Sequence, residues 1–247
     1  MMQVFFEIHK DLPREGPGDS QSTRKAFSML VELPRQPLIL DIGCGPGMQT
    51  LDLITLTDGK IVAVDNHQPF LDQLSKKAAQ KGVTDRITVV NADMSSLDFG
   101  EGTFDLIWAE GSAYTIGFEN ALRTWKPLLK RPGYLAATEI AWTKPAPPEE
   151  LKCFWAEEYP PMQDIESNLA ASRRAGYSAI GYFVLPESAW WHHYYTPVEH
   201  KLVALREKYK DNPKALAVVE FHQREIDLYR QYSDYYGYFF YVMEVNI

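Results

Sequence analysis

Cysteine is scarce in this chain of 247 residues: Cys44 and Cys153 are its two cysteines, and they lie far apart. Two distant thiols exclude a disulfide-stabilised secreted fold, so we expect a protein of the reducing cytoplasm. Cys44 lies within a glycine-rich turn, where a small side chain fits, and we interpret it as space-filling rather than as a nucleophile. No group of histidines and cysteines has the spacing of metal ligands, so no metal is expected.

Positive charge and long apolar runs are also lacking. Lys and Arg number 25 against 33 for Asp and Glu, a net charge of -8, which opposes the counterion release that drives nucleic-acid binding. No stretch approaches the roughly 20 apolar residues that span a bilayer, and the first ten residues lack the pattern of a signal peptide. We expect a soluble protein without a nucleic-acid or membrane partner, and a homodimer is left open.

Apolar residues are plentiful, at 45% of the chain, which suffices for the core of a single domain over residues 1–247. Residues 38–142 alternate short apolar runs with helical patterns, which is typical of a parallel sheet with crossover helices. Runs that are apolar throughout indicate strands covered on both faces. The expected strands are residues 38–42, 60–65, 87–90, 104–109 and 134–140.

Acids and glycines stand at the ends of three successive predicted strands. In an open α/β sheet, ligands bind outside the carboxyl ends of the strands, and glycines let the backbone follow a path close to a ligand. Asp65 can accept both hydroxyls of a ribose, while Asp93 with Met94 suits an adenine amino group and ring. The candidate ligand-binding residues are Asp41, Gly43, Cys44, Gly45, Gly47, Asp65, Asn66, Asp93 and Met94.

Two ligands compete for this predicted site. A dinucleotide fold needs G-x-G-x-x-G, but the third glycine, Gly47, comes one residue early. A glycine-rich helix start suits pyrophosphate, yet Asp41, just before the first glycine, would repel it. S-adenosylmethionine carries an ammonium and a sulfonium, and Asp41 would orient its amino-acid end through a water or a backbone group. The charges therefore favour S-adenosylmethionine.

Five motifs follow one another in the sequence, at residues 41–47, 64–65, 91–94, 104–108 and 129–134. In order and spacing they resemble the successive motifs of class I S-adenosylmethionine-dependent methyltransferases, over residues 38–140. A narrower resemblance, to small uncharacterised bacterial and archaeal members of the class, rests on residues 16–18, 22–25, 110–114, 116–119 and 234–238.

The resemblance implies a Rossmann-like α/β fold, with a seven-stranded, mostly parallel sheet, helices on both faces and an antiparallel last strand. Residues 177–185 and 239–245 would be the sixth and seventh strands, with a helical insertion at 196–236 between them. The domain would comprise an N-terminal cap segment (1–36), a cofactor-binding core (37–142) and a C-terminal substrate-side half (143–247).

The resemblance also implies methyl transfer to a small molecule by in-line displacement, with the protein holding the reactants in line. Glu110 is the best-placed base, although a cofactor or backbone contact explains it equally well, and Tyr114 would bond the acceptor or line its pocket. His192 is a further base candidate, although the aromatic run 190–195 is better explained as a hinge against the insertion. Arg24 is expected to close over the amino-acid end of the cofactor.

Two alternatives remain at this stage. A nicotinamide-dependent oxidoreductase would use the same fold, and the glycine spacing argues against it. A non-catalytic module that binds S-adenosylmethionine would carry the same glycine turn, so turnover is needed to separate it from an enzyme. The sequence does not define the acceptor, and the net charge of -8 disfavours a protein or RNA substrate.

Overall fold

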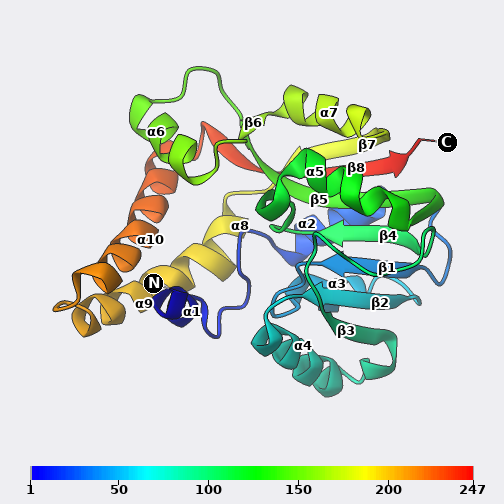
Figure 1. Ribbon diagram of the computed structural model, residues 1–247, viewed down its shortest axis with the longest axis horizontal. Helices are drawn as coiled ribbons and strands as arrows, with labels where there is room; N and C mark the ends of the chain where they lie inside the picture. Colours follow the sequence, from blue (N-terminus) through cyan, green and yellow to red (C-terminus); the bar gives the residue numbers. More distant parts are fainter. Residues whose placement is uncertain (1, 247) are drawn as a thin grey trace.

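The computed structural model describes residues 2–246 and contains one mixed β-sheet with helices on both faces (Figure 1). The strands are β1 (Leu38–Ile42), β2 (Lys60–Asp65), β3 (Ile87–Asn91), β4 (Phe104–Ala109), β5 (Leu129–Trp142), β6 (Gln163–Asp164), β7 (Tyr177–Val184) and β8 (Tyr236–Val245). Their order is β3-β2-β1-β4-β5-β8-β7, with β6 paired to β5. Strands β1 to β5 are parallel, whereas β8 is antiparallel to both β5 and β7.

This topology confirms the predicted fold class, including the antiparallel last strand. Two details differ from the prediction. Strand β5 begins at Leu129 rather than at residue 134, because its first residues pair with β4 ahead of a register shift. The two-residue β6, which pairs with the end of β5, has no signal in the sequence because it is too short to show a pattern.

The helices are α1 (Met2–His9), α2 (Ser20–Ser28), α3 (Met48–Leu53), α4 (Gln68–Lys81), α5 (Phe118–Trp125), α6 (Glu149–Glu158), α7 (Ile165–Arg174), α8 (Ser188–Trp190), α9 (Thr196–Lys208) and α10 (Pro213–Tyr232). Helices α5 and α7 pack on one face of the sheet, and α2, α3 and α4 cover the other. Local signals fix several helix ends. Asp19 accepts a hydrogen bond from the Ser22 amide at the start of α2, and Gly82 ends α4 in the left-handed conformation, as predicted.

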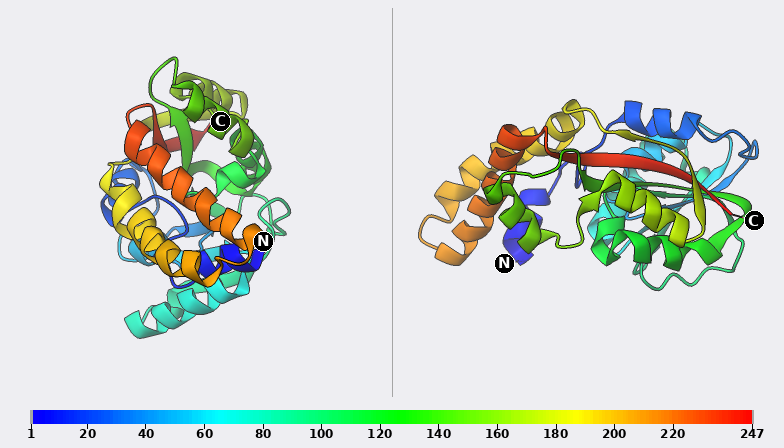
Figure 2. Two further views of the ribbon diagram at one scale, coloured as in Figure 1. Left: turned by 90° about the vertical axis from the view of Figure 1, so that its left-hand side faces the viewer. Right: turned by 90° about the horizontal axis from the view of Figure 1, so that it is seen from above.

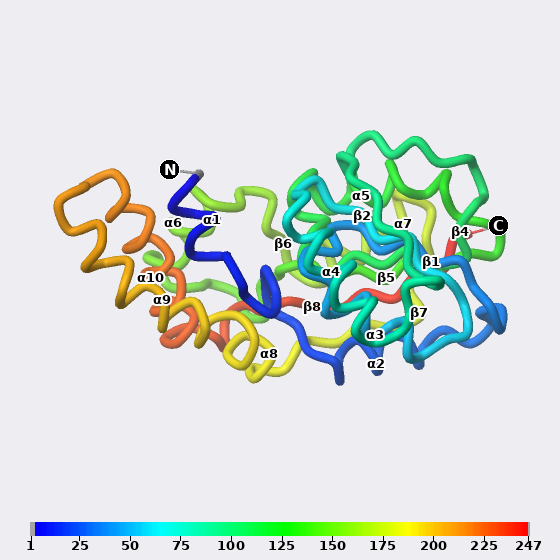
Figure 3. The backbone as a smooth tube through the Cα atoms, turned by 90° about the horizontal axis from the view of Figure 1, so that it is seen from below, coloured from blue at the N-terminus to red at the C-terminus, as the bar shows by residue number. Residues whose placement is uncertain are grey.

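A helical layer, residues 2–9, 149–158 and 188–232, lies beyond the carboxyl ends of the central strands (Figures 1 and 2). It has its own apolar core, which includes Ile8, Trp190, Leu202 and Ile226. Helix α1 packs against both α9 and α10, although they are far apart in the sequence (Figure 3). No helix within residues 2–246 has the length and apolar character needed to cross a bilayer.

The predicted insertion at 196–236 needs correction at both ends. Helical structure begins at Ser188 and takes in residues 191–195 as a π-helical turn that runs directly into α9, while Tyr236 already belongs to β8. Trp190, Tyr194 and Tyr195 are buried. Their burial explains why this aromatic run joins the core of the helical layer instead of forming a hinge. The sequence signals also do not predict α1 and α6.

Candidate active site

The glycine turn between β1 and α3 follows a path that side chains would obstruct. Gly43, Gly45 and Gly47 have φ angles of 71°, 52° and 86°, a region that favours glycine. A Cβ atom at Gly43 would lie 2.4 Å from Cβ of Ser112, and one at Gly47 would lie 2.3 Å from Cδ1 of Leu74. The turn is therefore packed tightly between the loop after β4 and helix α4.

Asp65, the last residue of β2, holds this turn in place. Its Oδ2 accepts a hydrogen bond from the Gly45 amide at 2.9 Å, and its Oδ1 accepts one from the His67 amide at 2.9 Å. The carboxylate is half-buried, and Asn66 beside it is exposed. Each carboxylate oxygen keeps a second lone pair, so Asp65 can accept ribose hydroxyls while it supports the glycine turn.

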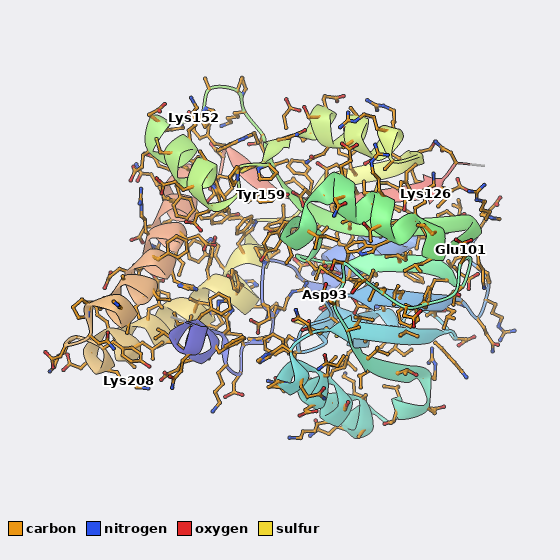
Figure 4. The ribbon with its side chains drawn as sticks, in the orientation of Figure 1. Asp93, Glu101, Lys126, Lys152, Tyr159 and Lys208 are labelled. Carbon is orange, nitrogen blue, oxygen red and sulfur yellow. The ribbon has the colours of Figure 1, made fainter. Side chains whose placement is uncertain are left out.

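Asp93 and Met94 lie at the same edge of the sheet, after β3. Figure 4 labels Asp93 at the edge that faces the helical layer. Oδ1 of Asp93 accepts bonds from the amide and the hydroxyl of Ser95, which hold the pKa of Asp93 below its usual value. Cε of Met94 lies 3.6 Å from the Cβ position of Gly43. The predicted ribose and adenine residues therefore share one edge with the glycine turn.

Asp41 is placed differently from the prediction, which put it where water or a ligand cation would meet it. Its side chain is fully buried, with Oδ2 accepting a hydrogen bond from Oγ1 of Thr50 at 2.5 Å. Oδ1 has no partner within the described residues. Burial raises the pKa of Asp41 to about 7. Asp41 therefore connects the end of β1 to helix α3.

Glu110 has all its protein partners in place, which argues against the predicted role as a general base. Its Oε2 accepts from Nη2 of Arg14 at 2.5 Å, and its Oε1 accepts from Oγ1 of Thr23 at 2.7 Å and Nε1 of Trp108 at 2.8 Å. The side chains of Arg14 and Glu110 are 4% and 1% exposed. A carboxylate paired in this way anchors the N-terminal segment to the end of β4.

The structure also places the predicted arginine differently. Arg24 is exposed on α2, while Arg14 reaches the interior. Nη1 of Arg14 is buried and has no partner among residues 2–246. The expectation that the N-terminal segment closes over the strand ends fits this geometry, but Arg14 is the residue that lies there. Its position depends on tertiary contacts, and no local signal in the sequence reveals it.

Cys44 is fully buried in the glycine turn, and burial raises the pKa of its thiol well above the usual value. An un-ionised thiol is a poor nucleophile, which agrees with the space-filling interpretation. The residues described by the structure include no cluster of three or more His, Cys, Asp or Glu arranged to hold a metal ion.

A cavity of about 620 Å³ lies between the sheet edge and the helical layer. Gly16, Pro17 and Gly111 line it on the side of the glycine turn, and Tyr114 lines it as well. The rings of Tyr114 and Tyr159 meet edge to face at 5.9 Å, and Figure 4 shows Tyr159 between α6 and the sheet. The cavity is therefore enclosed by both layers of the molecule.

The histidines of the cavity differ from the predicted one. His192 is exposed, because the π-helical turn directs it away from the interior, and it does not line the cavity. His9 from α1 and His222 from α10 line it instead, together with Glu15 and Glu225. These four residues come from segments that are distant in the sequence, which is why sequence reasoning missed them.

Comparison with known proteins finds a methyltransferase domain in this chain. Residues 39–133 match the family described as methyltransferase domain. The fold matches that of a methyltransferase from Geobacter sulfurreducens solved with S-adenosyl-L-homocysteine, with a TM-score of 0.83 and 19% identity over 99% of this chain and 98% of that one. YjhP from E. coli has a TM-score of 0.85 and 16% identity over 99% of this chain and 100% of that one. Residues 39–133 therefore carry a methyltransferase domain, and the chain has the fold of S-adenosylmethionine-dependent methyltransferases.

The curated relatives share only part of their length with this chain. The uncharacterized methyltransferase YodH of Bacillus subtilis is 29% identical over 55% of this chain and 57% of its own length. A malonyl-[acyl-carrier protein] O-methyltransferase of Legionella pneumophila is 39% identical over 43% of this chain and 37% of its own. The domain match and the shared fold confirm the predicted resemblance to class I S-adenosylmethionine-dependent methyltransferases and do not favour a nicotinamide-dependent oxidoreductase.

Proposed function

We propose that this methyltransferase transfers the methyl group of S-adenosylmethionine to a small molecule held in the cavity. The observation that carries the proposal is the contact between the glycine turn and the cavity wall. A Cβ atom at Gly45 would lie 3.5 Å from Cγ of Glu15, and Gly43 packs against Ser112, next to Gly111. Glu15 and Gly111 both line the cavity, so a cofactor on the turn would border a bound acceptor.

The residues at the sheet edge fit S-adenosylmethionine. Asp65 would take the ribose hydroxyls, and Asp93 with Met94 would flank the adenine. Nη1 of Arg14, buried without a partner in the described chain, suits the carboxylate of the amino-acid end. When bound, the cofactor supplies a methyl group already activated by the sulfonium. The protein's part is to hold the acceptor in line with it and to exclude water.

The size and charge of the cavity support a small-molecule acceptor. A volume of about 620 Å³ lies within the range of small-molecule sites. The chain's net charge of -8 offers no electrostatic footprint for a nucleic acid. Two free cysteines agree with a reducing cytoplasm. Sedimentation of the purified protein measures whether it forms the homodimer that the sequence left open.

Turnover separates an enzyme from a module that only binds the cofactor. The purified protein is incubated with S-adenosylmethionine labelled in the methyl group and with fractionated metabolite pools, and labelled products are followed by mass spectrometry. We expect a labelled small molecule and one equivalent of S-adenosylhomocysteine. Cofactor binding without any labelled product from any fraction would contradict the proposed function.

A further inference from the structure

The charged side chains that line the cavity are mostly acidic. They are Glu15, Glu158, Glu225 and Lys214. Glu225 accepts a hydrogen bond from Oη of Tyr195 at 2.9 Å, and burial raises its pKa. Within residues 2–246, no salt bridge includes Glu158 or Glu225. Glu158 is exposed, whereas Glu225 is half-buried. A carboxylate held away from bulk water without a counter-ion is costly, so a cationic ligand would be stabilised beside Glu225.

Aromatic side chains form much of the remaining wall. They include Phe5, Tyr114, Phe154, Trp155, Trp190 and Phe221. Aromatic faces attract ammonium groups and also cover apolar surface. A carboxylate or phosphate acceptor would meet like charges in this cavity, and a neutral acceptor would leave Glu225 without a counter-ion. An ammonium ion on an apolar body satisfies both the acidic and the aromatic parts of the wall.

A row of three side chains in close contact, Glu15, His9 and His222, borders the same cavity. Nδ1 of His9 lies 2.7 Å from Oε2 of Glu15, and Nε2 of His9 lies 3.3 Å from Nε2 of His222. Nδ1 of His222 lies 2.8 Å from the carbonyl oxygen of Val218. A carbonyl oxygen only accepts, so Nδ1 of His222 donates, and Nε2 of a neutral His222 carries a lone pair.

The same reasoning fixes the proton on His9. The ionised Glu15 accepts a bond from Nδ1 of His9, so Nε2 of a neutral His9 also carries a lone pair. Two lone pairs then face each other across 3.3 Å. One added proton turns this repulsion into a hydrogen bond, and the charge of Glu15 balances it. The His9–His222 pair is therefore built to accept one proton.

We propose that the cavity binds an amine in its ammonium form, and that the His9–His222 pair accepts a proton from its nitrogen before methylation. This inference rests on the proposed function, because it names the acceptor of that reaction. Glu225 and the aromatic wall hold the cation, and Glu15 stabilises the proton on the histidine pair. Glu15 also packs against Gly45 of the glycine turn. It therefore links the histidine pair to the turn on which the cofactor would bind.

The steps balance in atoms and charge. The ammonium nitrogen gives one proton to the lone pair of a histidine Nε2 and regains its own lone pair. That lone pair forms the new bond to the methyl carbon as the bond from carbon to sulfur breaks, and its electron pair goes to the sulfur. The products are a methylated ammonium ion and S-adenosylhomocysteine, with no further reactant required.

Other titratable groups share the cavity with the histidine pair and would influence its protonation. They are Glu15, Tyr114, Glu158, Tyr159, Tyr194, Lys214, Glu225 and Tyr238. Burial lowers the pKa of His222, and His9 lowers it further. The lowered pKa of His222 favours its neutral form, which is the state that accepts a proton.

Calorimetric titration of the full-length protein, saturated with S-adenosylhomocysteine, tests the acceptor class. The probes are phenethylamine, 2-phenylethanol and 3-phenylpropionate, which share an apolar body and differ in charge. We expect the amine to bind at least about tenfold more tightly than the alcohol. Glu225→Gln keeps the bond from Tyr195 and should remove that preference. Glu220→Gln, on the same helix but paired with Arg206 at the surface, is the matched control and should keep it.

The two proposals fail in different ways in this experiment. Absence of S-adenosylhomocysteine binding in the wild-type protein would contradict the proposed function. Normal S-adenosylhomocysteine binding, with the alcohol or the carboxylate binding as tightly as the amine, would overturn the ammonium assignment alone. Loss of binding of S-adenosylhomocysteine in Glu225→Gln would mark a folding defect, and Glu158→Gln then serves as the second variant, with a weakened preference for the amine expected.

The proton step is tested by the pH dependence of methylation of phenethylamine. Near pH 7 we expect His9→Gln to lower kcat about a hundredfold, with the loss shrinking as the pH approaches the amine's own pKa of about 10. His200→Gln, exposed on α9, should match the wild type. The proton step would be overturned if kcat of His9→Gln ran parallel to that of the wild type across the pH range. It would also be overturned if the wild-type protein bound phenethylamine without methylating it.

Discussion

The sheet side of the active site and its helical side are built in different ways. On the sheet side, backbone geometry fixes the glycine turn, and Asp65 supports it through the amides of Gly45 and His67. On the helical side, side chains from α1, α6, α10 and the π-helical turn meet only in the folded protein. The backbone-defined side suits a ligand shared by related proteins, and the side-chain-defined side is where we propose that acceptor choice resides.

Substitution of Arg14, which connects the N-terminal segment to the end of β4, should give the largest change in stability. Arg14→Ala leaves Glu110 buried without its cation, which should lower the free energy of unfolding by about 3–5 kcal/mol. It should also weaken binding of S-adenosylmethionine, since Arg14 supplies the unpaired Nη1. Arg24→Ala is the matched control, and we expect a change within about 0.5 kcal/mol. Urea denaturation measures both variants; equal stabilities would show that the ion pair with Glu110 does not join the two sides.

A substitution in the glycine turn should destabilise the sheet side of the active site, while the helical layer keeps its structure. Gly43→Ala combines a left-handed backbone with a Cβ atom 2.4 Å from Ser112, and should cost about 3 kcal/mol in total. Gly102→Ala has the same kind of backbone but open space around it, so its cost should be about 1 kcal/mol. Similar losses in denaturation experiments would mean that close packing against Ser112 is unimportant.

The pH dependence of stability sharpens the comparison at Glu139, a buried residue of β5 behind the cavity wall. Burial raises the pKa of Glu139 to about 8, and its Oε1 accepts from Oη of Tyr159 at 2.6 Å. The folded state therefore holds a proton that the unfolded chain releases above its ordinary pKa. Stability from this group is present at low pH and is lost as the pH rises from about 5 through 8, by about 1 kcal/mol per pH unit.

Glu139→Gln should remove this slope, because the amide oxygen still accepts from Tyr159 and carries no charge. Glu166→Gln, exposed on α7, should leave the slope unchanged. Denaturation midpoints measured from pH 5 to pH 9 give the comparison. Parallel curves for wild type and Glu139→Gln would contradict the raised pKa of Glu139.

The difference between the two sides also explains what the sequence could predict. The glycine turn, Asp65 and Asp93 follow from local chemistry, since adjacent parallel strands bring their carboxyl ends to one edge. His9 and His222 carry no such signal, because tertiary packing alone brings α1 to α10. The errors have the same origin: His192 points outward because a π-helical turn changes the phase of the helix, and Arg14 replaces Arg24 because the chain folds back onto Glu110.

Calorimetric titration with S-adenosylmethionine and S-adenosylhomocysteine tests the central claim most directly, on wild type, Asp65→Ala and the control Asp85→Ala. Asp85 is exposed before β3, at the opposite end of the strands. Micromolar binding to wild type and Asp85→Ala, weakened at least about tenfold in Asp65→Ala, is the predicted result. No binding of either ligand to the wild type, or equal binding to all three proteins, would contradict the assignment of the cofactor to this sheet edge.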